Sequence, residues 1–482
     1  MRKYIHIFAS FFLLLSLVFF SGCSLFKTQR TTYQVKLEVW GLFDDSDTFS
    51  KAISEYRKRN LRVANIEYKK LEVESYETEL RDALASGKGP DIFLIHNSWM
   101  TKHRDKLSPA PDTVLGAKQV QDLFADVVTK DFVKDGKVCA LPLSVDSLAL
   151  YFNRDYLNQA GISTPPRTWA EFDAAVSRLT RIDSFGNIVL SGAAMGASSE
   201  ASAGEGKINR ATDILTLLMM QAGAEMYDYT NNLASFAKFT PGTLQSESRI
   251  PPGQSALQYY TKFSNSSSKT YSWNSTMHNS VDSFIEGKTA MMLNYSWLIP
   301  KIQSKAPKLN LGISPVPQNI DNEGRGVNMN FANYWGFAVS KNKSGETEGT
   351  VEKVSVPATN DQRIFEAWQF IRYLTMPPAA SQNLPQAASS EEAARYDPAA
   401  EYATTQKKPA ARRDLIGAQA NDTLLAPFAQ GDMIARSWPQ PDDLAVEKIF
   451  NDMIDSVTLK SGEPRAALEQ AQNAVNLLLG KK

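Results

Sequence analysis

The sequence predicts an α/β fold, and three observations carry that prediction. Segments with strand-like alternation precede segments with helical periodicity, in the order strand, helix, strand, helix, strand. The third of these strands, Asp91-Ile92-Phe93-Leu94-Ile95, is an apolar run typical of strands buried on both faces of a parallel sheet. The 482 residues are 43% hydrophobic and 22% charged, a globular composition with length for two or three domains. Since parallel strands are joined by right-handed crossovers, the N-terminal part is predicted as an α/β layer sandwich.

The elements of this N-terminal part are assigned in chain order. Residues 35–40 alternate with period two and form the first strand. A helix follows, for which Asp47 is the expected cap and which carries its apolar residues on one face. Residues 63–71 form the second strand, and a helix over 76–86 ends at Gly87.

The same alternation continues along the rest of the chain. Elements are expected at 148–152 (strand), 168–179 (helix with a Thr168/Glu171 capping box), 211–222 (helix), 283–293 (helix end, glycine turn and strand), 335–339 (strand), 364–375 (helix) and 464–479 (last helix). Three polar stretches without clear periodicity, 196–207, 342–362 and 379–411, are expected as long loops or insertions, the last with room for one loose helix.

Composition excludes several classes of function. The chain carries 52 basic and 52 acidic residues, so it lacks the clustered positive charge that nucleic-acid binding needs. Its four histidines, at 6, 96, 103 and 278, are too scattered for a zinc or metalloprotease motif, and no nucleophile elbow, P-loop or dinucleotide motif is present. We therefore expect no catalytic residue, no metal and no cofactor, although two carboxylates of a glycosidase could come from Asp44, Asp45, Asp442 or Asp443.

The first 22 residues have the layout of a secretory signal. A basic start at Arg2 and Lys3 leads into an apolar run, then small residues and Cys23. The ending Phe20-Ser21-Gly22-Cys23 resembles the lipobox of bacterial lipoproteins, with Phe20 where leucine is usual. That resemblance implies cleavage after residue 22, lipidation of Cys23 and a lipid-anchored linker over 23–32; a single membrane-spanning anchor is the alternative.

Four blocks of sequence carry a family resemblance. They read LASGKGPDI at 84–92; LPLSVD, LYFNRDYL and PPRTWAEF at 141–146, 150–157 and 165–172; FIEGKTAMM at 284–292; and PAARRD and EPRAAL at 409–414 and 463–468. In this order they resemble the extracellular solute-binding proteins of bacterial ABC importers, in the group that includes maltose- and oligosaccharide-binding proteins.

The resemblance implies a two-lobe periplasmic-binding-protein fold of the maltose-binding type (type II), with a ligand cleft between the lobes and hinge crossovers. Lobe 1 would hold 33–143 and 334–378, lobe 2 would hold 147–328 and 412–482, and 379–411 would be an insertion or long loop. The implied partners are a small-molecule solute, an ABC permease with its ATPase and, through the lipid, a membrane. The implied protein is a monomer on the outer face of the bacterial cytoplasmic membrane, at the cell surface or in the periplasm, and not an enzyme.

Ligands of open α/β sheets lie beyond the carboxyl ends of the strands, and this rule selects the candidate site. The selected loops each pair aromatic with short polar residues. The proposed ligand-binding residues are Trp40, Phe43, Asp44, His96, Asn97, Ser98, Trp99, Asp146, Asn294, Tyr295, Trp297, Asn333, Tyr334, Trp335 and Trp438.

This mixture of side chains favours a sugar or oligosaccharide as the ligand. The apolar face of a sugar ring stacks on tryptophan or tyrosine, and its hydroxyls need polar partners. The cleft loops offer Asp44 and Asp146 but no evident arginine, which disfavours amino acids and peptides. Each tryptophan could instead be core packing, and Asp146 could brace the hinge. The remaining alternatives are a non-sugar solute, or a cell-surface glycan-binding protein of the same fold without transport.

Overall fold

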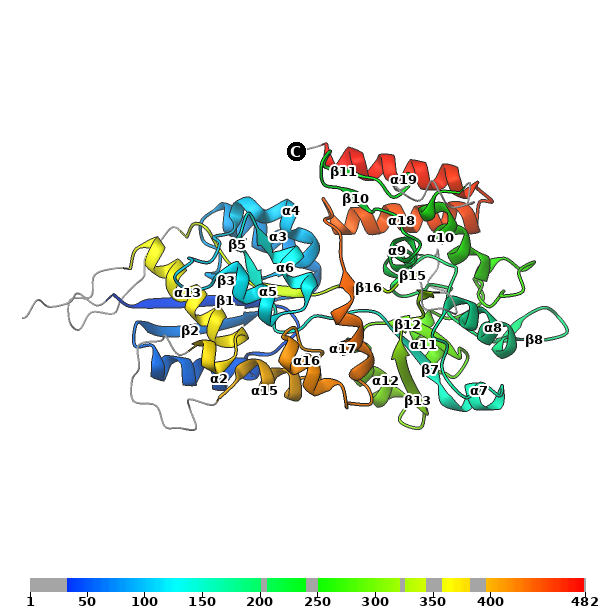
Figure 1. Ribbon diagram of the computed structural model, residues 1–482, viewed down its shortest axis with the longest axis horizontal. Helices are drawn as coiled ribbons and strands as arrows, with labels where there is room; N and C mark the ends of the chain where they lie inside the picture. Colours follow the sequence, from blue (N-terminus) through cyan, green and yellow to red (C-terminus); the bar gives the residue numbers. More distant parts are fainter. Residues whose placement is uncertain are drawn as a thin grey trace, which may run out of the picture.

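The computed structural model describes residues 33–200, 206–239, 250–320, 326–343, 358–381 and 396–480. The expected signal peptide, the linker and Cys23 lie outside these residues. Two separate hydrophobic cores, each built on its own sheet, divide the described chain into two lobes. Lobe 1 lies at the left of Figure 1 and lobe 2 at the right. The α/β two-lobe fold expected from the sequence is confirmed.

Lobe 1 is built on a five-stranded sheet of order β2-β1-β3-β17-β6. The strands are β1 Val35–Gly41, β2 Val63–Lys70, β3 Ile92–His96, β6 Ala140–Leu141 and β17 Trp335–Val339. β1 pairs in parallel with both β2 and β3, as the strand-helix alternation predicts, whereas β17 runs antiparallel to β3 and β6. A distant part of the chain therefore inserts a strand into the sheet.

Helices cover this sheet with their apolar sides. They are α2 Ser46–Arg59, α3 Val73–Ala85, α4 Met100–His103, α5 Ala117–Leu123, α6 Asp126–Phe132, α13 Asn360–Thr375, α15 Pro398–Thr405 and α16 Arg413–Gln419. The residue that precedes α2 is Asp45, so the expectation that Asp47 caps this helix is wrong. Asp47 lies in the first turn, where a negative charge is also favourable. α13 begins four residues before the expected start, because Thr359 and Gln362 form a capping box.

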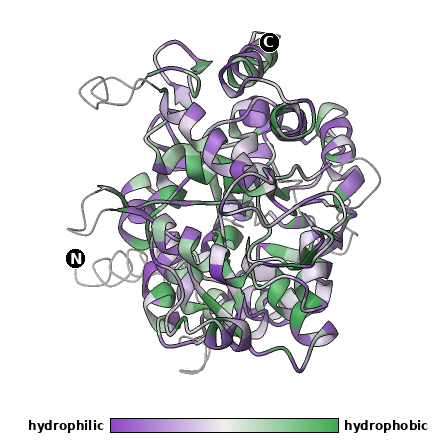
Figure 2. Ribbon diagram, turned by 90° about the vertical axis from the view of Figure 1, so that its right-hand side faces the viewer, coloured by the Kyte–Doolittle hydropathy of each residue, from purple (hydrophilic) through white to green (hydrophobic). Residues whose placement is uncertain are grey.

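Lobe 2 is built on a small antiparallel sheet of order β12-β7-β13. Its strands are β7 Ala149–Asn153, β12 Met291–Asn294 and β13 Leu311–Pro315. The surrounding helices are α7 Arg154–Gln159, α8 Trp169–Leu179, α9 Ala211–Gln221, α10 Pro252–Thr261, α11 Ser280–Ile285, α12 Ile299–Lys305, α18 Asp443–Thr458 and α19 Pro464–Leu479. Hydrophilic and hydrophobic residues alternate along the outer helices in Figure 2, as amphipathic helices on a core require. The Thr168/Glu171 capping box of α8 is present.

The segment expected as an insertion, 379–411, supplies part of lobe 1. Helix α15 and the residues after it bury Tyr402, Ala410 and Ala411 in the first core. Helix α16 adds Ile416 to the same core, so it lies with lobe 1 although 412–482 is expected in lobe 2. The proline, alanine and polar residues of this stretch give little periodicity, and tertiary contacts decide its place.

Three segments of the described chain cross between the cores, at 145–148, 331–332 and 416–438. The third contains α17 Ala426–Met433, which lies between the lobes in Figure 1. β16 Asn330–Phe331 pairs in parallel with β18 Ala435–Arg436, and Ser147 forms a bridge with Ala332. The backbone N–H of Asn333 donates to the carbonyl of Asp146 at 2.9 Å. The three segments are therefore hydrogen-bonded to one another and form the crossover region.

A buried acid, Asp432, lies at the end of α17 in this region. It is 0% exposed, and neither carboxylate oxygen makes a hydrogen bond of acceptable geometry to a described residue. Burial, and next the carboxylate of Asp146, raise the pKa of Asp432 well above its ordinary value, while the Ser147 hydroxyl lowers it. Asp432 is consequently held in its protonated form up to an unusually high pH.

Candidate ligand-binding cleft

Two connected chambers lie between the lobes. The first has a volume of ≈ 410 Å³ and the second ≈ 320 Å³. Phe43, Arg210, Asn333 and Trp335 line both chambers, so the chambers form one cleft with a shared wall. Volumes in this range suit a small ligand or a few linked rings.

Trp335 is the centre of the shared wall. Its ring meets those of Phe43, Tyr76, His96 and Trp99 edge to face, with centroids 5.9, 6.0, 5.0 and 4.9 Å away. The sheet explains this meeting: β17 runs antiparallel to β3, and its first residue Trp335 pairs with His96, the last residue of β3. The result is a rigid aromatic surface that faces both chambers.

The polar side chains beside the aromatic wall are held in place by hydrogen bonds to one another. The two ring nitrogens of His96 lie 2.6 Å from the Ser98 hydroxyl and 2.9 Å from Oδ1 of Asn333. Burial lowers the pKa of His96, so the neutral imidazole is favoured. Asn97 donates to Asp131 at 3.2 Å, and Tyr334 donates to the same carboxylate at 2.8 Å.

Lobe 2 contributes the loop after β12 to the first chamber. Because β12 and β7 are antiparallel, Tyr295, Ser296 and Trp297 come next to Asp146, which precedes β7. The backbone N–H and the hydroxyl of Ser296 donate to Asp146 at 3.0 and 2.7 Å. Burial raises the pKa of Asp146 to about 7 despite these hydrogen bonds. Asp146 thus joins the cleft loop to the crossover region.

Arg210 is a cleft residue that the sequence argument missed. It is the residue before α9, and it has a left-handed backbone with φ 63°. Its guanidinium lies over the rings of Tyr295 and Trp297, 5.6 and 5.7 Å from their centroids. Nη1 is 4.0 Å from Asp213, and the buried Nε has no hydrogen-bond partner among the described residues. The argument against amino acids and peptides from the lack of an arginine is therefore wrong.

A second missed group comes from the 379–411 segment. Lys408 forms an ion pair with Asp44 at 2.9 Å, and the Tyr402 hydroxyl donates to the other oxygen of Asp44 at 2.9 Å. All three residues line the first chamber. Asp44 lies in the loop after β1, so the carboxyl-end rule found the acid but not its distant partners.

Hydrogen bonds join the lobes across the second chamber. The Trp99 indole donates to Asp443 at 2.8 Å, and Lys102 donates to Asp442, the N-cap of α18, at 3.0 Å. Lys102 also pairs with Glu77 at 2.7 Å, and His103 lies 2.8 Å from the same oxygen. Although burial raises the pKa of Glu77, these two partners lower it to about 2. In the described conformation the two lobes are therefore in direct contact across the second chamber.

Most residues proposed from the sequence meet in this cleft. All of them line one or both chambers except Trp40 and Asn294. Trp40 belongs to β1 rather than to the loop after it, is 7% exposed and donates to Glu38 at 2.7 Å. Asn294 is 1% exposed and donates to Asn209 at 2.9 Å, so it fixes the loop from behind.

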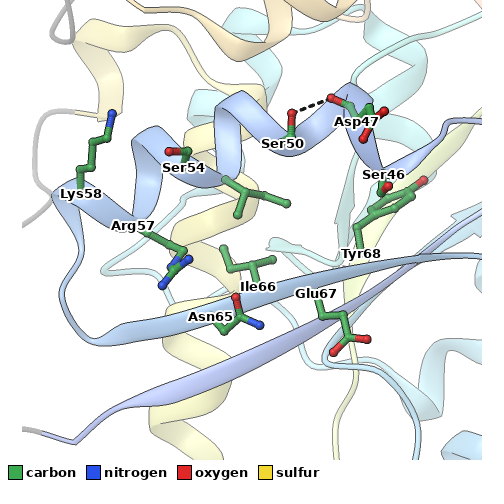
Figure 3. A pocket seen from close by; sticks show the side chains of 11 residues that line it. Ser46, Asp47, Ser50, Ser54, Arg57, Lys58, Asn65, Ile66, Glu67 and Tyr68 are labelled. Atoms are coloured by element: carbon green, nitrogen blue, oxygen red, sulfur yellow. Dashed lines mark hydrogen bonds between the residues drawn. The ribbon is translucent and has the colours of Figure 1, made fainter.

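A larger hollow of ≈ 670 Å³ lies elsewhere, on the outside of lobe 1 between α2 and β2. Figure 3 shows its lining: Ser50, Ser54, Arg57 and Lys58 from the helix stand above Asn65, Glu67 and Tyr68 from the strand. This groove is open and mostly polar, and among its lining residues only Tyr68 is aromatic. We therefore assign ligand binding to the cleft and not to this groove.

Within the described ranges, no three His, Cys, Asp or Glu side chains gather as a metal site would require. No helix in the described part of the chain has both the length and the apolar character to cross a membrane.

Comparison with known proteins relates the chain to a family. The family described as "Bacterial extracellular solute-binding protein" matches residues 51–394. The melibiose/raffinose/stachyose-binding protein MelE of Bacillus subtilis is 28% identical over 182 residues, 37% of this chain and 41% of that protein. A binding protein of Brucella abortus strain 2308 is 23% identical over 247 residues, 50% of this chain and 52% of that protein. The chain spans about half the length of the curated relatives it matches.

Solved structures share the fold over nearly the whole chain. The cyclic alpha-maltosyl-1,6-maltose binding protein of Arthrobacter globiformis superposes with a TM-score of 0.68 at 18% identity, covering 93% of this chain and 100% of that one. The sugar-binding protein MalE of Xanthomonas citri gives 0.64 at 16% identity, covering 93% and 98%.

Proposed function

Since the chain belongs to the bacterial extracellular solute-binding proteins, a family of binding proteins and not of enzymes, we propose that it captures a sugar or oligosaccharide in the cleft between its lobes. It then delivers that sugar to the permease and ATPase of an ABC importer. The family places the protein outside the cytoplasm. We further propose that a lipid on Cys23 holds it, as a monomer, at the outer face of the cytoplasmic membrane.

The aromatic wall around Trp335 is the observation that carries the sugar proposal. Trp335 and Phe43 face both chambers, and polar groups from both lobes, among them Asn333 and Arg210, surround them. Apolar ring faces and hydroxyl rims of a sugar match these two kinds of surface. The relatives named above as binders of oligosaccharides support the same ligand class.

A calorimetric screen tests the function. The full chain would be titrated with mono- and oligosaccharides, amino acids, peptides and polyamines. We expect binding to a sugar, at an affinity near micromolar and a free energy of about −8 kcal/mol. Binding only to non-sugars would overturn the sugar proposal, and product formation from a bound sugar would contradict a purely binding role.

Trp297→Ala is expected to weaken binding of that sugar by about tenfold or more, because one ring of the first chamber is lost. The Trp297 side chain is 44% exposed, so its removal should leave the thermal midpoint unchanged. Phe185→Ala is the matched control, since Phe185 is 89% exposed and lines neither chamber. If Trp297→Ala binds the sugar as tightly as the unaltered protein does, Trp297 does not contribute to ligand binding.

A further inference from the structure

We infer that the second chamber binds a protonated amino group, and that the ligand is an amino sugar. This inference rests on the proposed function, because it specifies which sugar the cleft takes. The residues that carry it line the second chamber where the first turns of α18, in lobe 2, meet α3 of lobe 1.

The second chamber is acidic. Its lining carboxylates are Glu74, Glu77, Asp213, Asp443 and Glu447, and its one lining arginine is Arg210. The remaining titratable group, His96, favours the neutral form because burial lowers its pKa. The charge of the chamber is therefore negative, which disfavours an acidic sugar and favours a cation.

Internal partners compensate only part of this charge. Glu77 is paired with Lys102, and Asp213 accepts from the Tyr295 hydroxyl at 2.9 Å and lies beside Arg210. Asp443 accepts from the Trp99 indole. Glu447, one helical turn after Asp443 on α18, has no hydrogen bond or ion pair with any described residue.

The surroundings of Glu447 make it the natural receptor for an ammonium group. Burial raises its pKa first, the carboxylates of Asp213, Asp443 and Glu200 raise it further, and Arg210 lowers it. A neutral ligand that fills the chamber would leave this carboxylate further desolvated and without a counter-charge. An ammonium group removes that penalty, because it neutralises the charge and donates three N–H groups.

The rest of the chamber fits a hydroxylated ring that carries the amine. The Trp438 ring, 4% exposed, also lines the chamber. Trp99 and Trp335 add aromatic faces for the apolar side of the ring and for the cation. A linear polyamine would satisfy the carboxylates but offers no ring face to these tryptophans.

The test is titration calorimetry on the full chain at a pH where sugar amines are protonated. The ligands are matched sets built on glucose, galactose and mannose, as monomers and short oligomers, each with a free amine, an N-acetylated amine or a hydroxyl; spermidine is the polyamine arm. We expect the free amine to bind about tenfold more tightly than its N-acetylated and hydroxyl counterparts. This comparison uses the unaltered protein, so it does not depend on how a variant folds.

Glu447→Gln removes the charge with almost no change in shape. We expect it to weaken binding of the amino sugar by about tenfold and to leave the hydroxyl counterpart within about twofold. Asp452→Asn is the matched control on the same helix, because Asp452 is exposed and pairs with Lys448. It should change neither affinity.

The outcomes separate the two proposals. If a neutral or N-acetylated sugar binds at least as tightly as the amine, or if Glu447→Gln weakens both alike, the amino-sugar inference fails while the sugar-binding function stands. If spermidine binds and no sugar does, both fail.

Discussion

Replacing Trp335 by alanine is expected to lower the affinity for the captured sugar by about 30-fold or more, which is the effect of losing a central aromatic anchor worth about 2 kcal/mol. The reason is geometric. Trp335 faces both chambers, and its edge-to-face contacts with His96 and Trp99 hold those rings in place. Calorimetry with a sugar identified in the screen measures the change.

Trp335→Phe is the companion variant for this experiment. It keeps an aromatic face and should retain most of the affinity, while near-ultraviolet circular dichroism and the thermal midpoint report whether Trp335→Ala remains folded. If the alanine variant is folded and binds normally, the ligand lies away from this wall, and the outer groove between α2 and β2 becomes the site to examine.

Asp432→Asn is expected to stabilise the protein by about 1–3 kcal/mol at pH 7.5, because the folded chain must keep a proton on Asp432 that the unfolded chain releases at this pH. The effect should depend on pH. The folded state holds the proton of Asp432 more tightly than the unfolded state, so its contribution to stability is fully present below about pH 4 and is lost as pH rises toward the folded pKa. Asp432→Asn lacks this pH-dependent loss of stability, so the free energies of unfolding of the two proteins should become equal near pH 4.

Denaturant unfolding of both proteins from pH 4 to pH 8 measures this difference. Asp146, whose pKa burial raises to about 7, is present in both proteins and contributes the same slope to each. Asp452→Asn again serves as an exposed control. A destabilised Asp432→Asn, or a stability gap that does not change with pH, would show that the carboxylate of Asp432 has a favourable partner in solution.

Local pattern predicted individual elements in both lobes but not how distant strands assemble into the sheets. β1, β2 and β3 begin and end within a residue or so of the expected limits, because alternation and a buried apolar run are local signals. The strand over 335–339 was expected, but its place between β3 and β6 depends on pairing between distant residues. The sheet of lobe 2 joins β7 to β12 and β13 in the same way, and no local signal sets that register.

The residues of the candidate site likewise fall into those that a local rule selects and those that only the folded chain brings together. The rule that ligands lie beyond strand ends selected the loops at Asp44, His96 and Trp297, because that rule needs only the strands. Arg210 follows one polar stretch with little periodicity, and Lys408 lies within another, so only the folded chain brings them to the cleft. The single usable signal for Arg210 is its position directly before an apolar helix.

The crossover region has a consequence for how this chain folds. In the sheet of lobe 1, β17 lies between β3 and β6. Along the chain, however, the central part of lobe 2 separates β17 from those two strands. The sheet of lobe 1 therefore cannot be completed until that part of lobe 2 has been synthesised. Lobe 2 in turn waits for α18 and α19 at the end of the chain. Such dependence on pairing between remote residues slows folding. A slowly folding chain stays unfolded longer, and an unfolded chain is the form that a secretion channel can thread.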